Sequence, residues 1–495
     1  MKIMCIYPNA EGYSRIPLGM ALIMTILHNE GHEIKLFDTS FLRGENVDNT
    51  VRQKSGFVPT TDISNLYESY TDDEIDGILR LKIKFFSPDL IITSIVEDNY
   101  RYATHLLEIV KSIDKNITTI AGGSTPTVVP KIVMENPFID YVIQGEGEEA
   151  IVELCDALQH GDYVGYIQNL WWRDNQGNIW NNTVRPFVNL DTLPIQNLSF
   201  WDTRHFMKPY AGKVYKSGYV ELSRGCMNKC TYCINHTLQY CLSEAGKYCR
   251  RKSVSKLIEE VKVYKSQYGI ERIFFTDDNF LFMPTRTLEE FVEAWKEVGL
   301  PYWINTTAET INNTRLGFLK ESGCDGISIG VESGSEWLRT NILNRKTKNT
   351  TIIDTFELIH RYGIRTSSNI MMGFPGESEY NLFESIGLLK TIEPKAMDVS
   401  FVTPYMGTVI HKLATELGMI ETMDEPGFTG FAKFKSMREP CINIPGVSND
   451  RLMEIFNSFT DYVRGVIPIP DLSVSSPDYN TANIMKRILD EHLCR

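Results

Sequence analysis

The sequence predicts an α/β protein built from two successive series of strands and helices, followed by a mainly helical C-terminal module. Between residues 2 and 148, short apolar runs alternate with helical patterns and end in glycine-rich turns. Six further apolar runs follow between residues 218 and 402, again separated by helical stretches. After residue 411 the periodicity is mainly that of helices. Alternating strands and helices favour parallel sheets in both series.

The first series predicts a doubly wound parallel sheet over residues 1–160. Helices are expected around 21–29 and 102–113, and strands at 2–8, 33–38, 90–96, 118–123 and 140–148. Small residues follow three of the strands, at 8–12, 122–125 and 145–148. Ligands of open α/β sheets bind beyond the carboxyl ends of the strands, where glycine allows a close approach of the backbone. Three such loops at one edge indicate a ligand site.

The second series predicts an incomplete barrel. Residues 161–217 are expected to form a linker with a hairpin around 175–177. Strands are expected at 218–223, 272–277, 302–307, 326–331, 365–372 and 397–402. Six β/α units are fewer than the eight of a closed TIM barrel, so residues 218–411 predict a partial (β/α)6 barrel with an open side. Residues 412–495 form the helical module.

The composition of the chain argues against some classes of partner and indicates a cellular compartment. The chain has 50 basic and 63 acidic residues and a net charge of -13, which argues against nucleic acid as a partner. No apolar run is long enough to span a membrane, and no secretory signal is visible at the start, so we expect a cytoplasmic protein without a membrane partner. Because that compartment is reducing, clustered cysteines indicate metal or redox chemistry.

Three cysteines lie close together in "SRGCMNKCTYC", directly after the first predicted barrel strand. Cys226, Cys230 and Cys233 are three potential thiolate ligands, and no second CxxC pair completes a structural zinc site. Three thiolates suit a 4Fe-4S cluster with one iron left open for a substrate or cofactor. The three residues are therefore both the predicted metal ligands and the predicted catalytic centre. Structural cysteines or a zinc knuckle are the alternative, and Cys241 and Cys249 stay open questions.

Several motifs together carry a resemblance to a known family. "CMNKCTYC" is similar to the CxxxCxxC signature of the radical S-adenosylmethionine (SAM) superfamily, and "FFTDDNF", "SIGVESGS", "MMGFPGES" and "PYMGT" follow in the family's order. The segments "PLGMALI", "AGGSTPT" and "YVIQGEGEEA" resemble the Rossmann-like cobalamin-binding domain that precedes the barrel in one large subfamily, the class B radical SAM methyltransferases. The resemblance covers roughly residues 1–410.

The resemblance implies which residues hold the cofactors. The open iron would bind S-adenosyl-L-methionine, which is cleaved to a 5'-deoxyadenosyl radical that abstracts a substrate hydrogen. Residues expected around this cofactor are Tyr232, Asp278, Asn279, Glu309, Glu332 and Asn369. Residues expected around cobalamin are Pro17, Leu18, Gly19, Ser94, Ile95, Gly122, Gly123, Ser124, Gly145, Glu146 and Gly147.

The implied function is that of a cobalamin-dependent methyltransferase. A methyl group would pass from methylcobalamin to an unactivated carbon of a peptide or protein residue or of a small-molecule natural product, with an external electron donor such as ferredoxin or flavodoxin. The sequence has no Asp-x-His-x-x-Gly, so we predict cobalamin without a lower histidine ligand. Two alternatives remain: a rearrangement or cyclisation that uses both cofactors, and a barrel whose N-terminal domain is only a docking scaffold.

Overall fold

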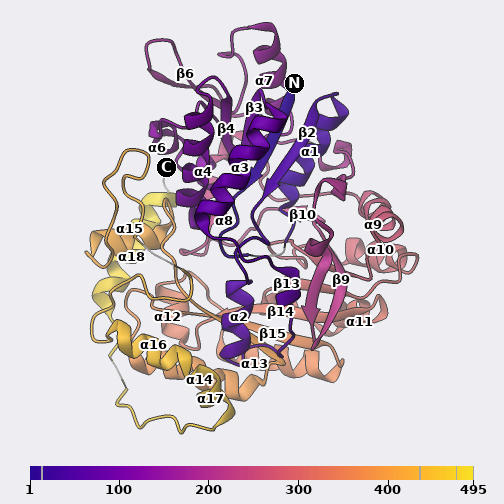
Figure 1. The fold of residues 1–495 in the computed structure, drawn as a ribbon. Coiled ribbons are helices and arrows are strands. Elements are labelled where there is room, and N and C mark those ends of the chain that lie inside the picture. Colours follow the sequence, from indigo (N-terminus) through magenta and orange to yellow (C-terminus); the bar gives the residue numbers. More distant parts are fainter. Residues whose placement is uncertain (13–14, 434–435, 475, 494–495) are drawn as a thin grey trace.

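A computed structural model describes residues 1–12, 15–433, 436–474 and 476–493. Two seven-stranded sheets form the framework, one in the N-terminal part of the chain and one in the middle. In Figure 1 the first sheet and its helices lie above the second, and the C-terminal helices lie along one side of both. The predicted α/β fold class is confirmed.

The first sheet has the strand order β2-β1-β3-β4-β5-β6-β7 and is parallel from β2 to β5. Its strands are β1 (Lys2–Tyr7), β2 (Glu33–Asp38), β3 (Leu90–Ser94), β4 (Thr118–Gly122), β5 (Tyr141–Ile143), β6 (Leu170–Arg173) and β7 (Ile179–Asn181). Strands β6 and β7 form the hairpin that the sequence predicted between the two series. The hairpin is not a free linker, because β6 pairs antiparallel with β5 and extends the first sheet.

Helices cover both faces of the first sheet, as its apolar strands require. Ile3 and Cys5 of β1 pack on one face with residues of α1 (Leu18–Asn29) and α7 (Ala150–His160). Met4 and Ile6 point to the opposite face, into a second cluster with α3 (Asp72–Phe86) and α4 (Glu97–Ile113). Ile95 after β3 and Ile143 at the end of β5 take part in this packing, whereas the glycine-rich loops after β4 and β5 line a cavity.

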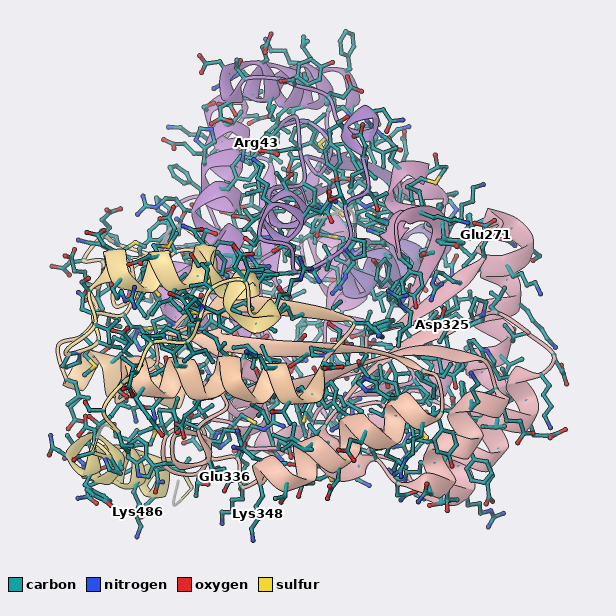
Figure 2. All side chains as sticks on the ribbon, turned by 90° about the horizontal axis from the view of Figure 1, so that it is seen from below. Arg43, Glu271, Asp325, Glu336, Lys348 and Lys486 are labelled. Carbon is teal, nitrogen blue, oxygen red and sulfur yellow. The ribbon has the colours of Figure 1, made fainter. Side chains whose placement is uncertain are left out.

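The second sheet has the order β16-β15-β14-β13-β12-β9-β8. Its strands are β8 (Met207–Tyr210), β9 (Lys213–Val220), β12 (Arg272–Phe275), β13 (Tyr302–Thr306), β14 (Cys324–Glu332), β15 (Arg365–Met372) and β16 (Ala396–Phe401). Strands β9 to β16 are parallel and give the six predicted units, and β8 adds an antiparallel edge. Figure 2 shows this half-barrel from below, with Glu271 and Asp325 in it and Arg43 in the first unit.

The half-barrel has an apolar outer face and a polar inner face. Ile327, Ile329 and Val331 of β14 are buried in the core, whereas Ser328 and Glu332 alternate with them on the inner face. The outer face is covered by α9 (Val254–Tyr268), α10 (Thr285–Trp295), α11 (Asn313–Glu321), α13 (Asn349–Arg361) and α14 (Glu379–Ile392). Period-two burial of this kind fits strands with helices on one side and a ligand space on the other.

A segment between β2 and α3 covers the open edge of the half-barrel beside β16. This segment contains α2 (Val47–Lys54), which Figure 1 shows next to β15 rather than beside the first sheet. Met397 N in β16 donates a hydrogen bond to Phe57 O at 3.1 Å. The Phe57 ring is buried and packs edge-on against Phe456 and Phe459. The sequence pattern did not predict this insertion, although it joins the two units.

The C-terminal part of the chain wraps around the half-barrel with helices α15 (Val409–Glu416), α16 (Asn449–Asn457), α17 (Phe459–Arg464) and α18 (Tyr479–Leu493). Ser458 separates α16 from α17. Helix α15 packs on α18, and α14 packs on α17, so the C-terminal helices share the core of the barrel. Within the described residues, no helix is both long and apolar enough to cross a membrane.

Candidate functional site

The three predicted ligand cysteines lie on one loop after β10 (Ser223–Arg224), at the carboxyl end of β9. Cys230 is buried, and Cys226 and Cys233 are partly buried. Asp277 anchors the start of this loop, because its carboxylate accepts hydrogen bonds from Leu222 N at 3.0 Å and Ser223 N at 2.7 Å. Sequence reasoning chose the neighbouring Asp278 and missed Asp277, whose role depends on a contact between two strand ends.

The environment of the thiols fits an iron-sulfur cluster. The backbone N–H groups of Asn228 and Asn235 donate to the sulfur atoms of Cys226 and Cys233, and donors of this kind stabilise cluster thiolates. Burial raises the pKa of Cys226 to about 11 and that of Cys233 to about 12, so bound iron is what would deprotonate them. No described group of three His, Cys, Asp or Glu side chains converges on one ion. An iron-sulfur cluster does not require three side chains to meet at one ion, because each of the three thiolates binds a different iron atom.

Tyr232 and Glu332 form a buried network with Arg345. The Arg345 guanidinium lies 3.2 Å from Glu332 Oε1 and donates to Tyr232 Oη at 3.4 Å. Burial raises the pKa of Glu332, and Arg345 opposes that shift. Glu332 has a φ of 69° beside a register shift in β14, and its side chain stays on the inner face of the half-barrel. Sequence reasoning missed Arg345 because it follows α12 (Glu336–Asn341) and no strand.

The other residues expected around SAM lie at different depths. Asp278 raises the pKa of both Cys226 and Cys233, and its Oδ1 accepts from Asn235 Nδ2 at 2.8 Å. Glu309 lies exposed just past β13 and acts electrostatically on Cys230. Asn279 is buried and its amide is engaged by the hydroxyls of Thr306 and Thr307. Asn369 lines a deeper cavity of the half-barrel.

A cavity of about 280 Å³ lies at the carboxyl ends of the first sheet. It brings together seven of the residues predicted for cobalamin: Gly19, Ser94, Gly122, Gly123, Gly145, Glu146 and Gly147. Its other walls include the isoleucines Ile23, Ile92, Ile120, Ile143 and Ile151. Glycines open the mouth and branched apolar side chains form the walls, which fits insertion of a flat organic base and its nucleotide linkage. The residues therefore fit the cofactor that the resemblance implies.

The remaining predicted residues support this cavity or lie beside it. Pro17 precedes α1, Leu18 is its first residue, and neither lines the cavity. Ile95 is buried against Gly123, where a Cβ atom would come within 2.5 Å of Ile95 O, so only glycine fits there. Ser124 lines a neighbouring cavity. The described residues that line the 280 Å³ cavity include no histidine, and the prediction about the lower ligand stays a prediction.

Charged residues tie this cavity to the cysteine loop. Arg224, two residues before Cys226, lines the cavity and lies 2.8 Å from Glu146 Oε1 and 2.7 Å from Glu148 Oε1. Arg250 of β11 (Arg250–Arg251) also pairs with Glu146, at 2.5 Å. These two arginines hold the pKa of Glu146 below its usual value against the effect of burial. Glu146, predicted as a cofactor ligand, is therefore an ion-pair partner that joins the two units.

A second junction lies where the loop after β16 meets the start of α4. Met406 N donates to Glu97 Oε2 at 2.7 Å, and Tyr405 Oη donates to Asp98 at 3.0 Å. Burial raises the pKa of Glu97 to about 8. These residues and Ser124 line a cavity of about 220 Å³. The "PYMGT" segment thus contacts the first unit directly.

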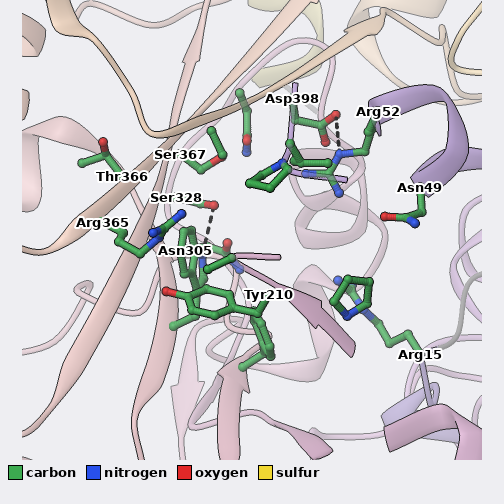
Figure 3. Close-up of a pocket in the computed structure, with 18 of the residues that line it drawn as sticks. Arg15, Asn49, Arg52, Tyr210, Asn305, Ser328, Arg365, Thr366, Ser367 and Asp398 are labelled. Atoms are coloured by element: carbon green, nitrogen blue, oxygen red, sulfur yellow. Dashed lines mark hydrogen bonds and ion pairs between the residues drawn. The ribbon is translucent and has the colours of Figure 1, made fainter. Parts of the chain in front are cut away.

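The inside of the half-barrel encloses a third and larger cavity, of about 390 Å³. Figure 3 shows its polar wall, with Ser328, Ser367 and Asn305 on the strands and Tyr210 and Arg365 at one end. Arg15 and Arg52 reach it from the first unit. No residue singled out from the sequence except Asn369 lines this space, because a strand pattern alone does not say which face is concave.

Two family descriptions match the chain, one for each unit. Residues 11–155 match the B12 binding domain, and residues 220–389 match the radical SAM superfamily. The first range contains the glycines and isoleucines of the 280 Å³ cavity, and the second begins at the last residue of β9 and contains Glu221, Arg224 and the cysteine loop.

Full-length relatives share this arrangement. An uncharacterized methyltransferase of Pyrococcus horikoshii is 26% identical over 95% of both chains, and the cytidylyl-2-hydroxyethylphosphonate methyltransferase of Streptomyces wedmorensis is 23% identical over 87% of this chain and 82% of its own. In fold, the chain is similar to the radical SAM methyltransferase TsrM of Kitasatospora setae, solved with cobalamin and a [4Fe-4S] cluster, at a TM-score of 0.65, 15% identity and 99% coverage of both chains. The chain thus carries a domain of the radical SAM superfamily, preceded by a B12-binding domain.

Proposed function

We propose that this protein is a cobalamin-dependent radical SAM methyltransferase that methylates an unactivated carbon. The observation that carries the proposal is the position of Arg224, which ends β10 two residues before Cys226 and also lines the cobalamin cavity. The two cofactor sites are therefore neighbours. Bound SAM and its cluster supply radical formation, and bound cobalamin supplies methyl transfer to carbon. The methyltransferases among the relatives support this assignment.

The residues of this chain have defined tasks in the proposed site. Cys226, Cys230 and Cys233 would hold the cluster, and the Asp277 carboxylate fixes the loop that carries them. Asp278, whose Oδ1 already accepts from Asn235 Nδ2 at 2.8 Å, and Glu309 are the acceptors offered to the ammonium and hydroxyl groups of SAM, since a carboxylate can accept several hydrogen bonds. The insertion that contains α2 covers the open edge of the half-barrel and keeps water from the radical.

The test measures two products that are formed from SAM and the fate of its labelled methyl group. The full chain is reconstituted anaerobically with iron, sulfide and cobalamin, then incubated with methyl-labelled SAM, a reductant and candidate substrates. We expect S-adenosylhomocysteine from methyl donation, 5'-deoxyadenosine from radical formation, and the label in the product. Protein reconstituted without cobalamin should form no labelled product. 5'-Deoxyadenosine with an unlabelled, rearranged product would instead identify a rearrangement or cyclisation.

Two further parts of the proposal have separate tests. An external one-electron donor such as ferredoxin or flavodoxin is needed to reduce the cluster, and replacing it with chemical reductants should change the rate but not the products. Electron paramagnetic resonance of cobalamin bound to the protein in the cobalt(II) state should show no nitrogen splitting from a histidine. If the cluster-loaded protein failed to retain cobalamin, this result would support the alternative that the first unit is only a docking scaffold.

A further inference from the structure

The cavity inside the half-barrel extends away from the cysteine loop: Thr276 and Asn369 connect it to the predicted SAM residues, but no described residue from 225 to 233 lines it. Arg365 and Ala396 are the first residues of β15 and β16, and Trp303 is the second of β13; all three line the cavity. The cavity therefore reaches the amino-terminal ends of the strands, whereas the cysteine loop follows a carboxyl end. The hairpin of β8 and β9 closes it below through Pro209, Tyr210 and Ala211.

The charged lining of this cavity is positive in a protein whose net charge is -13. Among the described residues that line it are three arginines and one aspartate: Arg15, Arg52, Arg365 and Asp398. Asp398 lies 3.4 Å from Arg52 and 3.1 Å from Arg438, so its charge is compensated within the protein. Arg365 and Arg15 have no carboxylate within ion-pair distance in the described part of the chain. Two arginines of the wall thus carry a charge that no described carboxylate compensates. This surplus of positive charge favours an anionic ligand.

Neighbouring side chains fix the Arg365 end of the cavity and add hydrogen-bond donors to it. The Arg365 guanidinium lies 5.6 Å from the centre of the Tyr210 ring. Arg272 stacks on the same ring at 3.6 Å and pairs with Asp325 at 2.5 Å, which holds Tyr210 in place. Trp303 Nε1 donates to Ser328 Oγ at 3.1 Å, so the hydroxyl hydrogen of Ser328 remains available to a ligand.

The other walls are aromatic. Tyr219 and Phe274 are stacked with ring centres 5.7 Å apart, and the Trp303 ring lies 6.4 Å from Phe274. The Arg15 guanidinium lies 5.0 Å from the centre of the Tyr219 ring. Figure 3 shows Arg365 and Arg15 on opposite sides of the cavity with Tyr210 between them. A ligand that meets Arg365 with an anionic group would lay an apolar or planar body against these rings.

The boundaries of the cavity favour a small molecule over a peptide. Its volume of about 390 Å³ is within the range of small-molecule sites. The side next to β16 is lined by Asn49, Arg52, Val58, Pro59 and Thr61, and the bottom is lined by the β8–β9 hairpin. None of the described residues of 412–495 lines it, so the C-terminal helices leave this space to the strands and the insertion.

We propose that the half-barrel cavity is the substrate site and that its substrate is a small molecule with a carboxylate or phosphonate-type anion on an apolar or planar body, the anion being bound by Arg365 and Ser328. This inference rests on the proposed function, because it assumes that the ligand of this cavity is the molecule to be methylated. Arg365 is here a specificity-determining residue, and the rings of Tyr219, Phe274 and Trp303 hold the body of the substrate.

The experiment compares isosteric probes that differ in charge. Binding of 3-phenylpropionate, 2-phenylethylphosphonate and the neutral 3-phenylpropionamide to the reconstituted full-length protein is measured by calorimetry and by saturation-transfer NMR. At least one anion should bind roughly 10- to 100-fold more tightly than the amide, the range expected for hydrogen bonds to a charged group. Arg365→Gln should remove that preference, and Arg365→Lys should restore part of it.

Arg361→Gln is the matched control, because Arg361 is exposed on α13 and carries the same charge away from the cavity. It should keep the preference for the anion. Equal binding of the amide and both anions, an unchanged preference in Arg365→Gln, or no binding of either anion at millimolar concentration would overturn the proposal. Absorption spectra of cobalamin and cluster in Arg365→Gln should match those of the unmodified protein, which excludes general misfolding.

These readouts separate this inference from the proposed function. Anion binding that depends on Arg365, together with a reaction that forms no S-adenosylhomocysteine, would keep the anion site and reject methyl transfer. Labelled methyl transfer to a neutral substrate, unaffected by Arg365→Gln, would keep the function and reject the anion site.

Discussion

The two sheets of this protein are both mainly parallel, yet they use their faces differently. Strand β1 of the first sheet is buried at four consecutive positions, because helices cover both faces. Strands β13 and β16 of the second sheet alternate between buried and partly buried residues, because only the outer face meets helices. The first sheet can therefore bind a ligand only at its edge, whereas the second encloses a ligand against its inner face.

This difference explains the chemistry of the cavities. The 280 Å³ cavity at the edge of the first sheet has glycines and isoleucines, which suit a cofactor that is held permanently. The 390 Å³ cavity on the inner face of the second sheet has arginines, serines and aromatic rings, which suit a ligand that must be recognised and released. Substitutions in one unit at a time can show whether the other unit is affected.

The largest effect is expected from the cysteine loop. Cys230→Ala removes one of three predicted ligands, so the cluster should be lost and 5'-deoxyadenosine formation should fall to background. Cobalamin retention should be unchanged, since the glycines and isoleucines of the cavity belong to the first unit and Glu221 and Arg224, which also line it, are not altered. Iron and sulfide analysis with product chromatography measures both effects. Cys324→Ala, a buried cysteine of β14 outside the loop, is the control and should keep the cluster.

A substitution in the first unit should have the opposite effect, which is loss of cobalamin while the cluster is retained. Gly122 lines the cavity, has no atom within 4 Å of the place of a Cβ, and ends β4. Gly122→Val would fill this space without backbone strain and should lower cobalamin retention roughly 10-fold or more while the cluster spectrum stays normal. Gly77→Val in α3 also meets open space and should retain cobalamin. Joint loss of both cofactors would contradict the independence of the two units.

A smaller effect is expected where the two units meet. Arg224→Gln would remove the cation that Glu146, Glu148 and Glu221 share in a partly buried site. The loss of stability should be about 3–5 kcal/mol, as for other broken buried pairs. Urea unfolding of the cofactor-free protein measures it. Arg487→Gln breaks an exposed pair with Glu416 and should cost less than about 1 kcal/mol.

Sequence patterns predicted what is local and repetitive in this fold. Six parallel strands, the glycine loops of the first sheet and the position of the cysteines after β9 all follow from periodicity and spacing. The hairpin at β6 and β7 was also visible, but its membership in the first sheet was not, since pairing with β5 depends on contacts distant in sequence.

What the sequence could not predict are contacts between units. Helix α2 buries none of its own residues, so its pattern gives no sign that it covers the half-barrel. Arg345 reaches Glu332 from a turn after a short helix, and Asp277 acts through the backbone of a neighbouring strand. Arg365 and Ser328 face the cavity because the sheet curls, and curvature is a property of the assembled strands.

The smallest effect is expected from the pH dependence of stability, through Glu377 in the turn after β15. Glu377 is buried, its Oε2 accepts from Gly373 N at 2.6 Å and Phe374 N at 3.1 Å, and burial raises its pKa from 4.5 to about 8. The unfolded chain releases this proton at lower pH than the folded protein, so Glu377 makes the protein less stable as the pH rises from about 4.5 to about 8. Above that window the contribution is constant.

Glu377→Gln keeps the acceptor oxygen and removes the charge, so its thermal midpoint should exceed that of the unmodified protein increasingly as the pH rises through this window. Glu357→Gln, an exposed carboxylate on α13, should run parallel to the unmodified protein at every pH. Parallel curves for Glu377→Gln would mean that water or a cation reaches this carboxylate. The turn after β15 would then be less dry than the burial of Glu377 indicates.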